Sequence, residues 1–313
     1  MPEVRSILAV RLGAFGDILH ALPAIQSLKR SFPASEVTLL IASRWLPIVQ
    51  GNPFIDRLLA PKLAIVRELR PALAFDFQGL LKSALLARLA RPAKLYGFDR
   101  SVARERFASM FYTHPIPVVG PHRIERNLQL IAAAGASNLS MDTWIPPGRP
   151  EGDLPPGPFV LASPFAGWAG KQWPLENYSA VGEVLSGEGL ELVINVPEEK
   201  RHALSGLKHV RVHSSSLPGL INATRRTTAI LGVDSGPLHL AAALRKPGVA
   251  LYGPTDPDRT GPFGGTMTVL RSDQVQTTYK RHGSIHASMN AITPKQVTEA
   301  VLRSVANASV RRS

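Results

Sequence analysis

The chain has 313 residues, 44% hydrophobic and 19% charged, a composition typical of globular proteins and unlike that of disordered or fibrous ones. It contains no apolar run of the roughly 20 residues that a membrane span requires, and its lack of cysteine excludes disulfides, thiol catalysis and cysteine-based metal sites. Lys and Arg exceed Asp and Glu by 13, and residues 1–150 hold 19 basic against 10 acidic residues, so we expect an anionic partner such as nucleic acid, a membrane surface or a phosphorylated substrate.

The first half of the chain alternates short apolar runs with helical patterns, which indicates an α/β fold. Ile7–Val10 predicts a strand, followed by a glycine-containing turn and a helix over residues 18–30. A second strand at Val37–Ile41 completes a β-α-β unit of the length that a right-handed parallel crossover needs. Further along, Leu73–Phe77 predicts a strand and Leu80–Leu89 a helix.

A proline-rich segment then separates two similar halves. Residues 144–158 include six prolines, and because proline removes backbone donors and favours extended chain, this segment is the best candidate for a linker. The tail after Thr293 predicts an amphipathic helix with Thr293 as its cap and Pro294 at its first position. Strands are predicted in the second half at Phe159–Ser163, Leu190–Val196, Ala229–Val233 and Gly248–Tyr252.

The turn after the first predicted strand carries the pattern Gly13-x-x-Gly16-Asp17. Glycines let the backbone approach a ligand closely, and a helix N-terminus attracts negative charge. The spacing differs from the Gly-x-Gly-x-x-Gly fingerprint, so it does not favour a nicotinamide cofactor. Asp17 has two interpretations, as the N-cap of the following helix or as a carboxylate able to act as a general base.

Two turns in the second half suit an anion. After the strand ending at Val233, Asp234-Ser235-Gly236 opens a helix whose free amides and positive end favour a diphosphate, with His239 one turn along. The alternative interpretation is purely structural, namely a capped helix in which the histidine has no role in binding. The turn at Tyr252–Pro257, including Thr255, follows another strand, and ligands bind at that edge of doubly wound sheets.

Two other candidates are single features. Lys171 lies in a glycine-containing loop and suits a phosphate, although a solvated lysine is the commoner outcome. His282 and His286 have the spacing of metal ligands on a helix, but Gly283 disfavours a helix there and no carboxylates accompany them. We therefore expect no metal site.

Taken together, these segments resemble the lipopolysaccharide heptosyltransferases of glycosyltransferase family 9, most closely those of type I. The resemblance extends over nearly the whole chain in the same order. Ser235 stands where the family often has threonine, and Ala166 and Gly167 stand where some members have hydroxyl residues. The blocks that carry the resemblance are Arg11-x-x-x-x-Gly16-Asp17, Phe75–Ser83, Gly97–Asp99, Ala103–Glu105, His122–Asn127, Lys171–Pro174, Gly232–His239 and Tyr252–Pro257.

The resemblance implies a GT-B fold, in which two Rossmann-like domains with parallel sheets face each other. Residues 1–150 would bind the acceptor, residues 151–294 the nucleotide sugar, and the C-terminal helix at residues 295–313 would cross back onto the first domain. The implied activity is the transfer of L-glycero-D-manno-heptose from ADP-heptose to Kdo of Kdo-lipid A in the lipopolysaccharide inner core. The implied enzyme inverts the anomeric centre and uses no metal or other cofactor.

The resemblance also implies roles for single residues. Asp17 would be the catalytic base. The residues expected at the donor and its phosphates are Lys171, Asp234, Ser235, Gly236, His239, Thr255 and, less directly because loop lengths differ, Glu199. The residues expected at the acceptor are Gly16, Lys82, Arg100, Arg104, His122, Arg123 and Arg126.

The expected partners are an ADP-sugar, Kdo-lipid A and the anionic inner membrane. We accordingly expect a monomeric protein, peripheral on the inner membrane. A cytoplasmic location agrees with the sequence of Met1–Arg5, which lacks the pattern of a secretory signal. Three alternatives stay open. The first is a family 9 enzyme with another nucleotide sugar or acceptor, and the second is a non-catalytic homologue that only binds an ADP-sugar. The third is a basic nucleic-acid-binding protein, although low aromatic content disfavours binding of single strands.

Overall fold

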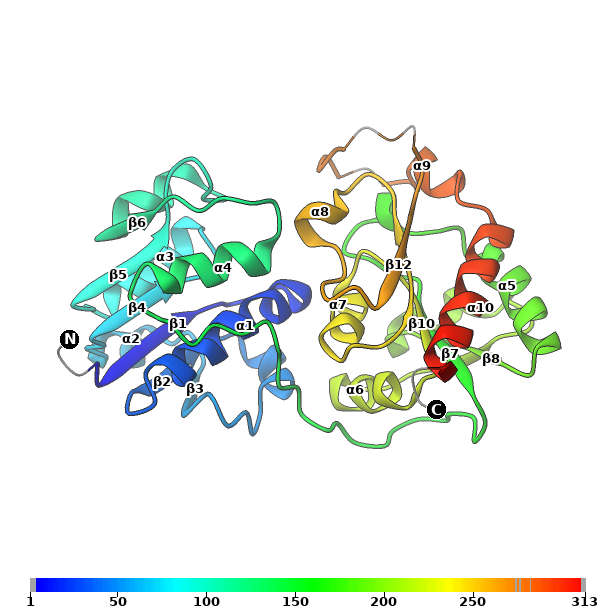
Figure 1. Cartoon of the computed structure of the whole chain (residues 1–313), viewed down its shortest axis with the longest axis horizontal. Coiled ribbons are helices and arrows are strands. Elements are labelled where there is room, and N and C mark those ends of the chain that lie inside the picture. The colour runs from blue at the N-terminus through cyan, green and yellow to red at the C-terminus, as the bar shows by residue number, and fades with distance from the viewer. Residues whose placement is uncertain (1–3, 274, 276, 282, 311–313) are drawn as a thin grey trace. The chain divides into compact units, whose positions relative to one another are not determined.

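The structure is a computed structural model that describes residues 4–273, 275, 277–281 and 283–310. The chain divides into two compact units, Met1–Pro146 and Pro147–Ser313, shown in Figure 1. The division falls inside the proline-rich segment. Over the described residues, no helix combines the length and the apolar character needed to cross a membrane.

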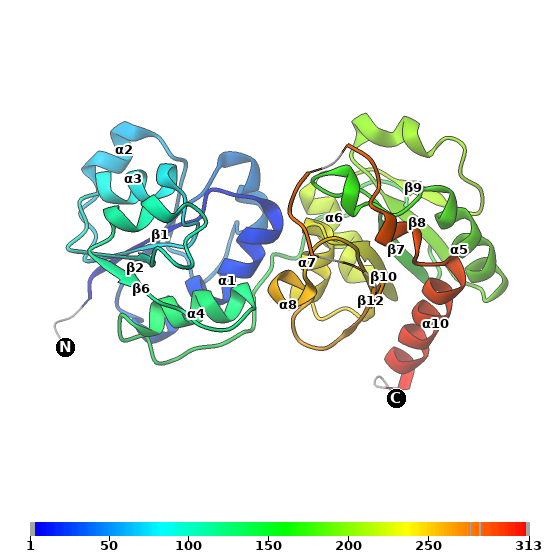
Figure 2. The same cartoon turned by 90° about the horizontal axis from the view of Figure 1, so that it is seen from above.

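The first unit is an alternation of parallel strands and helices. Its described elements are β1 (Ser6–Val10), α1 (Phe15–Ser31), β2 (Glu36–Leu40), η1 (Ser43–Ile48), β3 (Arg57–Leu59), α2 (Leu63–Glu68), β4 (Leu73–Asp76), α3 (Leu81–Leu89), β5 (Lys94–Phe98), η2 (Arg106–Phe111), β6 (His114–Ile116) and α4 (Arg123–Ala132). The η elements are short 3₁₀ helices. Figure 2 shows α2 and α3 on one side of the sheet and α4 on the other.

The second unit repeats this alternation. Its described elements are β7 (Phe159–Ser163), η3 (Ala169–Lys171), α5 (Glu176–Gly187), β8 (Glu191–Asn195), η4 (Glu198–Leu204), β9 (Arg211–His213), α6 (Leu217–Arg226), β10 (Ala229–Val233), α7 (Gly236–Ala243), β11 (Gly248–Tyr252), α8 (Pro257–Thr260), β12 (Met267–Arg271), α9 (Ala287–Asn290) and α10 (Pro294–Val310).

Each unit is built on a six-stranded parallel sheet, within the described residues. The first sheet has the order β3-β2-β1-β4-β5-β6 and the second β12-β11-β10-β7-β8-β9. Both are the strand order of a Rossmann fold, in which the chain changes direction across the sheet next to its first strand. The predicted α/β class with two Rossmann-like halves is confirmed.

The central strands are buried on both faces, which explains why their sequences are continuous apolar runs. β7, β10 and β11 are buried along their whole length, and their bounds match the predicted strands. The sequence did not reveal β3, β6 and β12, since these strands lie at or near sheet edges, are short or exposed, and contain charged or proline residues.

The C-terminal helix α10 begins at Pro294, as predicted. Thr293 Oγ1 accepts a hydrogen bond from the backbone N–H of Gln296, whose side chain accepts one from the Thr293 N–H, a reciprocal cap. Val297 and Val301 are fully buried in the core of the second unit, where α10 packs on α5, β10, β11 and β12. The expectation that residues 295–313 pack back on the first domain stays a prediction.

Gly97, on β5, faces the ring of Tyr112, and a Cβ placed on Gly97 would lie 2.3 Å from that ring. The ring has little room to move, because its hydroxyl donates to the buried Asp76. We expect Gly97→Ala to lower the free energy of unfolding by about 1–3 kcal/mol, measured by urea denaturation. Gly187→Ala is the matched control, since a Cβ there meets nothing within 4 Å. Equal stability of the two variants would contradict this packing.

Candidate active site

Both sheets place polar residues at the carboxyl ends of the two strands where the strand order reverses. In the first unit Arg11 follows β1 and Asp76 ends β4, while in the second unit Asp234 follows β10, beside β7. In open parallel sheets, ligands bind outside the carboxyl ends of the strands at this point. Each unit therefore has a candidate site of its own.

Asp17 lies in the first turn of α1 and forms ion pairs with two arginines. One carboxylate oxygen is 2.7 Å from Arg11 Nη2, and the other accepts from Arg123 Nη1. The N-cap of α1 is Ala14, so the interpretation of Asp17 as the N-cap residue is wrong. Its side chain is 17% exposed, which leaves the carboxylate partly accessible.

The arginines determine the charge state of Asp17. Burial acts to raise the pKa of the Asp17 carboxyl, but attraction to Arg11, Arg123 and Arg104 outweighs it and holds that pKa below its usual range. Asp17 is therefore ionised at neutral pH, the form in which a carboxylate accepts a proton.

Arg11 contacts a buried hydrogen-bond network at the end of β4. Arg11 Nη1 donates to the carbonyl oxygen of Phe77 at 2.6 Å. The neighbouring Asp76 is fully buried and accepts from Ser83 Oγ and the Tyr112 hydroxyl, each at 2.8 Å. Burial raises the pKa of Asp76, although these hydrogen bonds oppose that effect. These hydrogen bonds hold the end of β4 in place, and the Arg11 guanidinium binds the carbonyl directly after that strand.

Helix α4 positions Arg123 beside Asp17. It packs along α1, where Asn127 Nδ2 donates to the carbonyl oxygen of His20 at 2.9 Å. Its N-cap is His122, whose Nδ1 accepts from the backbone N–H of Ile124. Arg123 is the first residue of α4 and reaches Asp17 from there.

The expected acceptor residues have different surroundings. Gly16 is next to Asp17, and Arg104 is near enough to lower its pKa. Lys82 is exposed on α3 and Arg100 is exposed in the turn after β5. His122 is a buried helix cap, and Arg126 Nε donates to the carbonyl of Gly120. The last two side chains therefore have structural partners in place.

In the second unit Asp234 is the centre of a buried polar cluster. Its carboxylate is 3.1 Å from Lys171 Nζ and 3.3 Å from His239 Nε2, and it accepts from Thr255 Oγ1 at 2.8 Å. Burial acts to raise the pKa of Asp234, but the hydrogen bond from His239 and the charge of Lys171 hold it well below its usual range. The structure thus brings together four of the expected donor residues.

The N-terminus of α7 begins directly beside this cluster. Ser235 is its N-cap but makes no side-chain cap bond, and its hydroxyl has no hydrogen-bond partner within the described part of the chain. Gly236 is the first helical residue. The unused hydroxyl and the amides of the first turn form a site suited to an anion.

Glu199 is the exception among the expected donor residues. It is exposed on η4, after β8, and makes no described contact with Asp234 or Lys171.

The sequence analysis did not predict two features of the first unit. These are the pairing of Arg11 with Asp17 and the hydrogen-bond network of Asp76. The available signal was an arginine directly after a buried strand.

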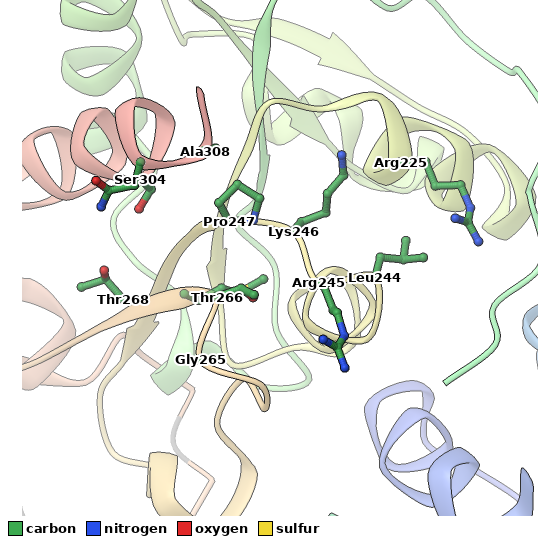
Figure 3. Close-up of a pocket in the computed structure, with 12 residues that line it drawn as sticks. Arg225, Leu244, Arg245, Lys246, Pro247, Gly265, Thr266, Thr268, Ser304 and Ala308 are labelled. Atoms are coloured by element: carbon green, nitrogen blue, oxygen red, sulfur yellow. The ribbon is translucent and has the colours of Figure 1, made fainter. Parts of the chain in front are cut away.

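Neither the histidines nor a cavity in the second unit provides a further candidate site. Over the described residues, no three His, Asp or Glu side chains gather as metal ligands. His286 caps α9, and His282 lies outside the described residues. A cavity of about 470 Å³ lies at the amino ends of β11 and β12, away from Asp234 at the carboxyl end of β10. Its cations Arg225, Arg245 and Lys246 point in different directions (Figure 3).

Comparison with known proteins gives one family. The model of glycosyltransferase family 9 (heptosyltransferase) matches residues 63–288. Lipopolysaccharide heptosyltransferase 1 of Pseudomonas aeruginosa is 29% identical over 297 residues, covering 85% of this chain and 84% of the relative. Lipopolysaccharide heptosyltransferase 3 of Escherichia coli is 26% identical over 294 residues, covering 80% and 84%.

Solved structures agree with the predicted GT-B fold. E. coli heptosyltransferase WaaC with ADP matches with a TM-score of 0.76 at 24% identity, covering 96% of this chain and 99% of that one. A family 9 glycosyltransferase from Veillonella parvula matches with a TM-score of 0.81 at 18% identity, covering 97% and 99%. TibC from enterotoxigenic E. coli, described as iron-containing, matches with a TM-score of 0.66 at 13% identity, covering 99% and 81%.

Proposed function

Since the chain belongs to glycosyltransferase family 9, the heptosyltransferase family, we propose that it transfers L-glycero-D-manno-heptose from ADP-heptose to Kdo of Kdo-lipid A. Two relatives support this choice of donor and step. The most similar curated sequence reported above is a heptosyltransferase 1, and the structure of WaaC holds ADP.

The observation that carries the mechanism is the placement of the Asp17 carboxylate, which pairs with Arg11 and Arg123 after the carboxyl end of β1. A Kdo hydroxyl oxygen attacks the anomeric carbon of heptose while its proton moves to Asp17. The bond from that carbon to the diphosphate oxygen breaks, and its electron pair leaves with ADP. One displacement of this kind inverts the anomeric centre and needs one base.

The second unit stabilises the leaving group. ADP departs with additional negative charge on its diphosphate, and groups already fixed in place lower the cost of that charge. Asp234 holds Lys171 at 3.1 Å, and the amides and hydroxyl of Ser235 and Gly236 lie beside it. Lys171 supplies positive charge and the amides and hydroxyl supply hydrogen-bond donors, so this leaving-group site does not require a metal.

The arginines also provide a pH test. Because the pKa of Asp17 is lowered, its carboxylate stays ionised below the ordinary aspartate value of about 3.9. Removing one positive neighbour raises that pKa, so Arg123→Met should move the acid limb of the kcat/KM profile to higher pH. Arg57→Met, which removes an exposed arginine paired with Glu36, should leave the limb in place. Identical limbs in the wild type and Arg123→Met would contradict the pairing.

Donor identity is tested by competition. ADP-heptose should be consumed in preference to UDP- and GDP-sugars, with release of ADP. The second candidate is a family 9 enzyme with another acceptor, such as one that already carries heptose, and the similarity to a heptosyltransferase with a different number, heptosyltransferase 3, favours it. It predicts turnover of that acceptor and none of Kdo-lipid A.

We also propose that the chain works as a monomer on the cytoplasmic face of the inner membrane. Its net charge of +13 would draw it to an anionic surface, since each Lys or Arg near such a surface contributes about 1 kcal/mol.

A further inference from the structure

Helix α3 has an unusual solvent face. Its exposed positions are Leu81, Lys82, Leu85 and Arg88, and the two leucines are 42% and 46% exposed. A surface helix ordinarily keeps its leucines on the inner stripe and polar residues outside. Here the inner stripe is already filled by Ala84, Leu86 and Ala87, so the outer leucines are additional apolar surface.

The neighbouring element η2 enlarges this surface. Phe107 is 54% and Met110 78% exposed, and η2 packs beside α3. Glu105 fixes the two together, because its Oε2 accepts from the backbone N–H of Leu81 at 2.7 Å. We call Leu81, Leu85, Phe107 and Met110 the α3–η2 face.

The segment that carries the α3–η2 face is strongly basic. The segment from Lys62 to Tyr112 contains ten Lys and Arg against four Asp and Glu. Of those acids, Asp76 is buried and Glu105 bonds to the start of α3. The cations nearest in sequence to the face are Lys82, Arg88, Arg104 and Arg106, all exposed. The Arg106 guanidinium lies 4.8 Å from the centre of the Phe107 ring.

We propose that the α3–η2 face docks the first unit on an anionic lipid bilayer. The four apolar side chains would enter the boundary between headgroups and acyl chains, and the cations of the same segment would meet the anionic headgroups. A second copy of this chain is a poorer occupant, because it would bring the same positive charge. The proposal deepens the proposed function, whose acceptor is a membrane lipid, by naming the surface that meets the membrane.

Vesicle sedimentation tests the face. Wild type should bind vesicles of phosphatidylethanolamine and phosphatidylglycerol, and bind phosphatidylcholine vesicles weakly. Phe107→Ser with Met110→Ser should weaken binding to the anionic vesicles by about tenfold or more, because two side chains no longer enter the bilayer. The matched control is Met141→Ser with Val184→Ser, which removes two apolar side chains that are 49% and 48% exposed elsewhere, and should bind as wild type does.

Equal vesicle binding by both double variants would overturn the proposal. So would failure of the wild type to bind vesicles together with concentration-dependent self-association that the Phe107 and Met110 changes abolish. A water-soluble deacylated acceptor separates this proposal from the proposed function. The Phe107/Met110 variant should turn it over at the wild-type rate while losing activity on acceptor embedded in vesicles. If no heptose is transferred to either acceptor, the proposed function fails and the vesicle result still decides the docking surface.

Discussion

Asp17→Asn is expected to reduce kcat by about 10²–10⁴-fold while leaving affinity for ADP-heptose nearly unchanged. The amide has almost the same shape as the carboxylate but cannot take the proton from the acceptor hydroxyl. Donor affinity should persist because the residues assigned to the donor belong to the second unit. The measurements are steady-state turnover and calorimetric titration with ADP.

Removing this carboxylate also leaves Arg11 buried without its ion-pair partner, so the variant must be shown to fold. Its melting temperature should be compared with that of the wild type. Asp142→Asn is the matched control, because Asp142 is exposed in the same unit, and it should retain full turnover. A folded Asp17→Asn enzyme with most of the wild-type turnover would exclude Asp17 as the base.

Lys171→Met is expected to reduce kcat by about 10²–10³-fold and, unlike Asp17→Asn, to weaken ADP binding as well. Lys171 Nζ is the cation closest to Asp234 at the start of α7, and methionine keeps much of the side-chain volume without the charge. Loss of the positive charge removes stabilisation of the departing diphosphate. Turnover and ADP titration measure both effects.

The control for this change is Lys208→Met, since Lys208 is an exposed lysine of the same unit. It should leave both parameters unchanged. If the Lys171→Met variant binds ADP as tightly as the wild type, the diphosphate of the leaving group does not bind beside Lys171. The two variants together separate the roles of the units, because only one of them should affect nucleotide binding.

Sequence patterns predicted well what depends on neighbouring residues. The runs at Phe159–Ser163 and Ala229–Val233 are strands because both faces are covered and every position is apolar. The turn at Asp17 was located by its glycines, Gly13 and Gly16, and the turn at Asp234 because a polar residue follows a buried strand. The cap of α10 is likewise local, since Thr293 and Gln296 are three residues apart.

Contacts between distant residues could not be read in this way. Arg123 reaches Asp17 across 106 positions, and Arg11 reaches the Phe77 carbonyl across 66. Only packing of α4 on α1, and of β1 beside β4, creates those pairs. The pattern of α10 predicted an amphipathic helix but contained no information on which sheet its buried residues Val297 and Val301 would cover.

The most direct measurement is mass spectrometry of the product made by the purified full chain from ADP-heptose and Kdo-lipid A. The proposed activity predicts an acceptor heavier by one heptose and an equal amount of ADP. An unchanged Kdo-lipid A, with heptose added only to an acceptor that already carries heptose, would contradict it.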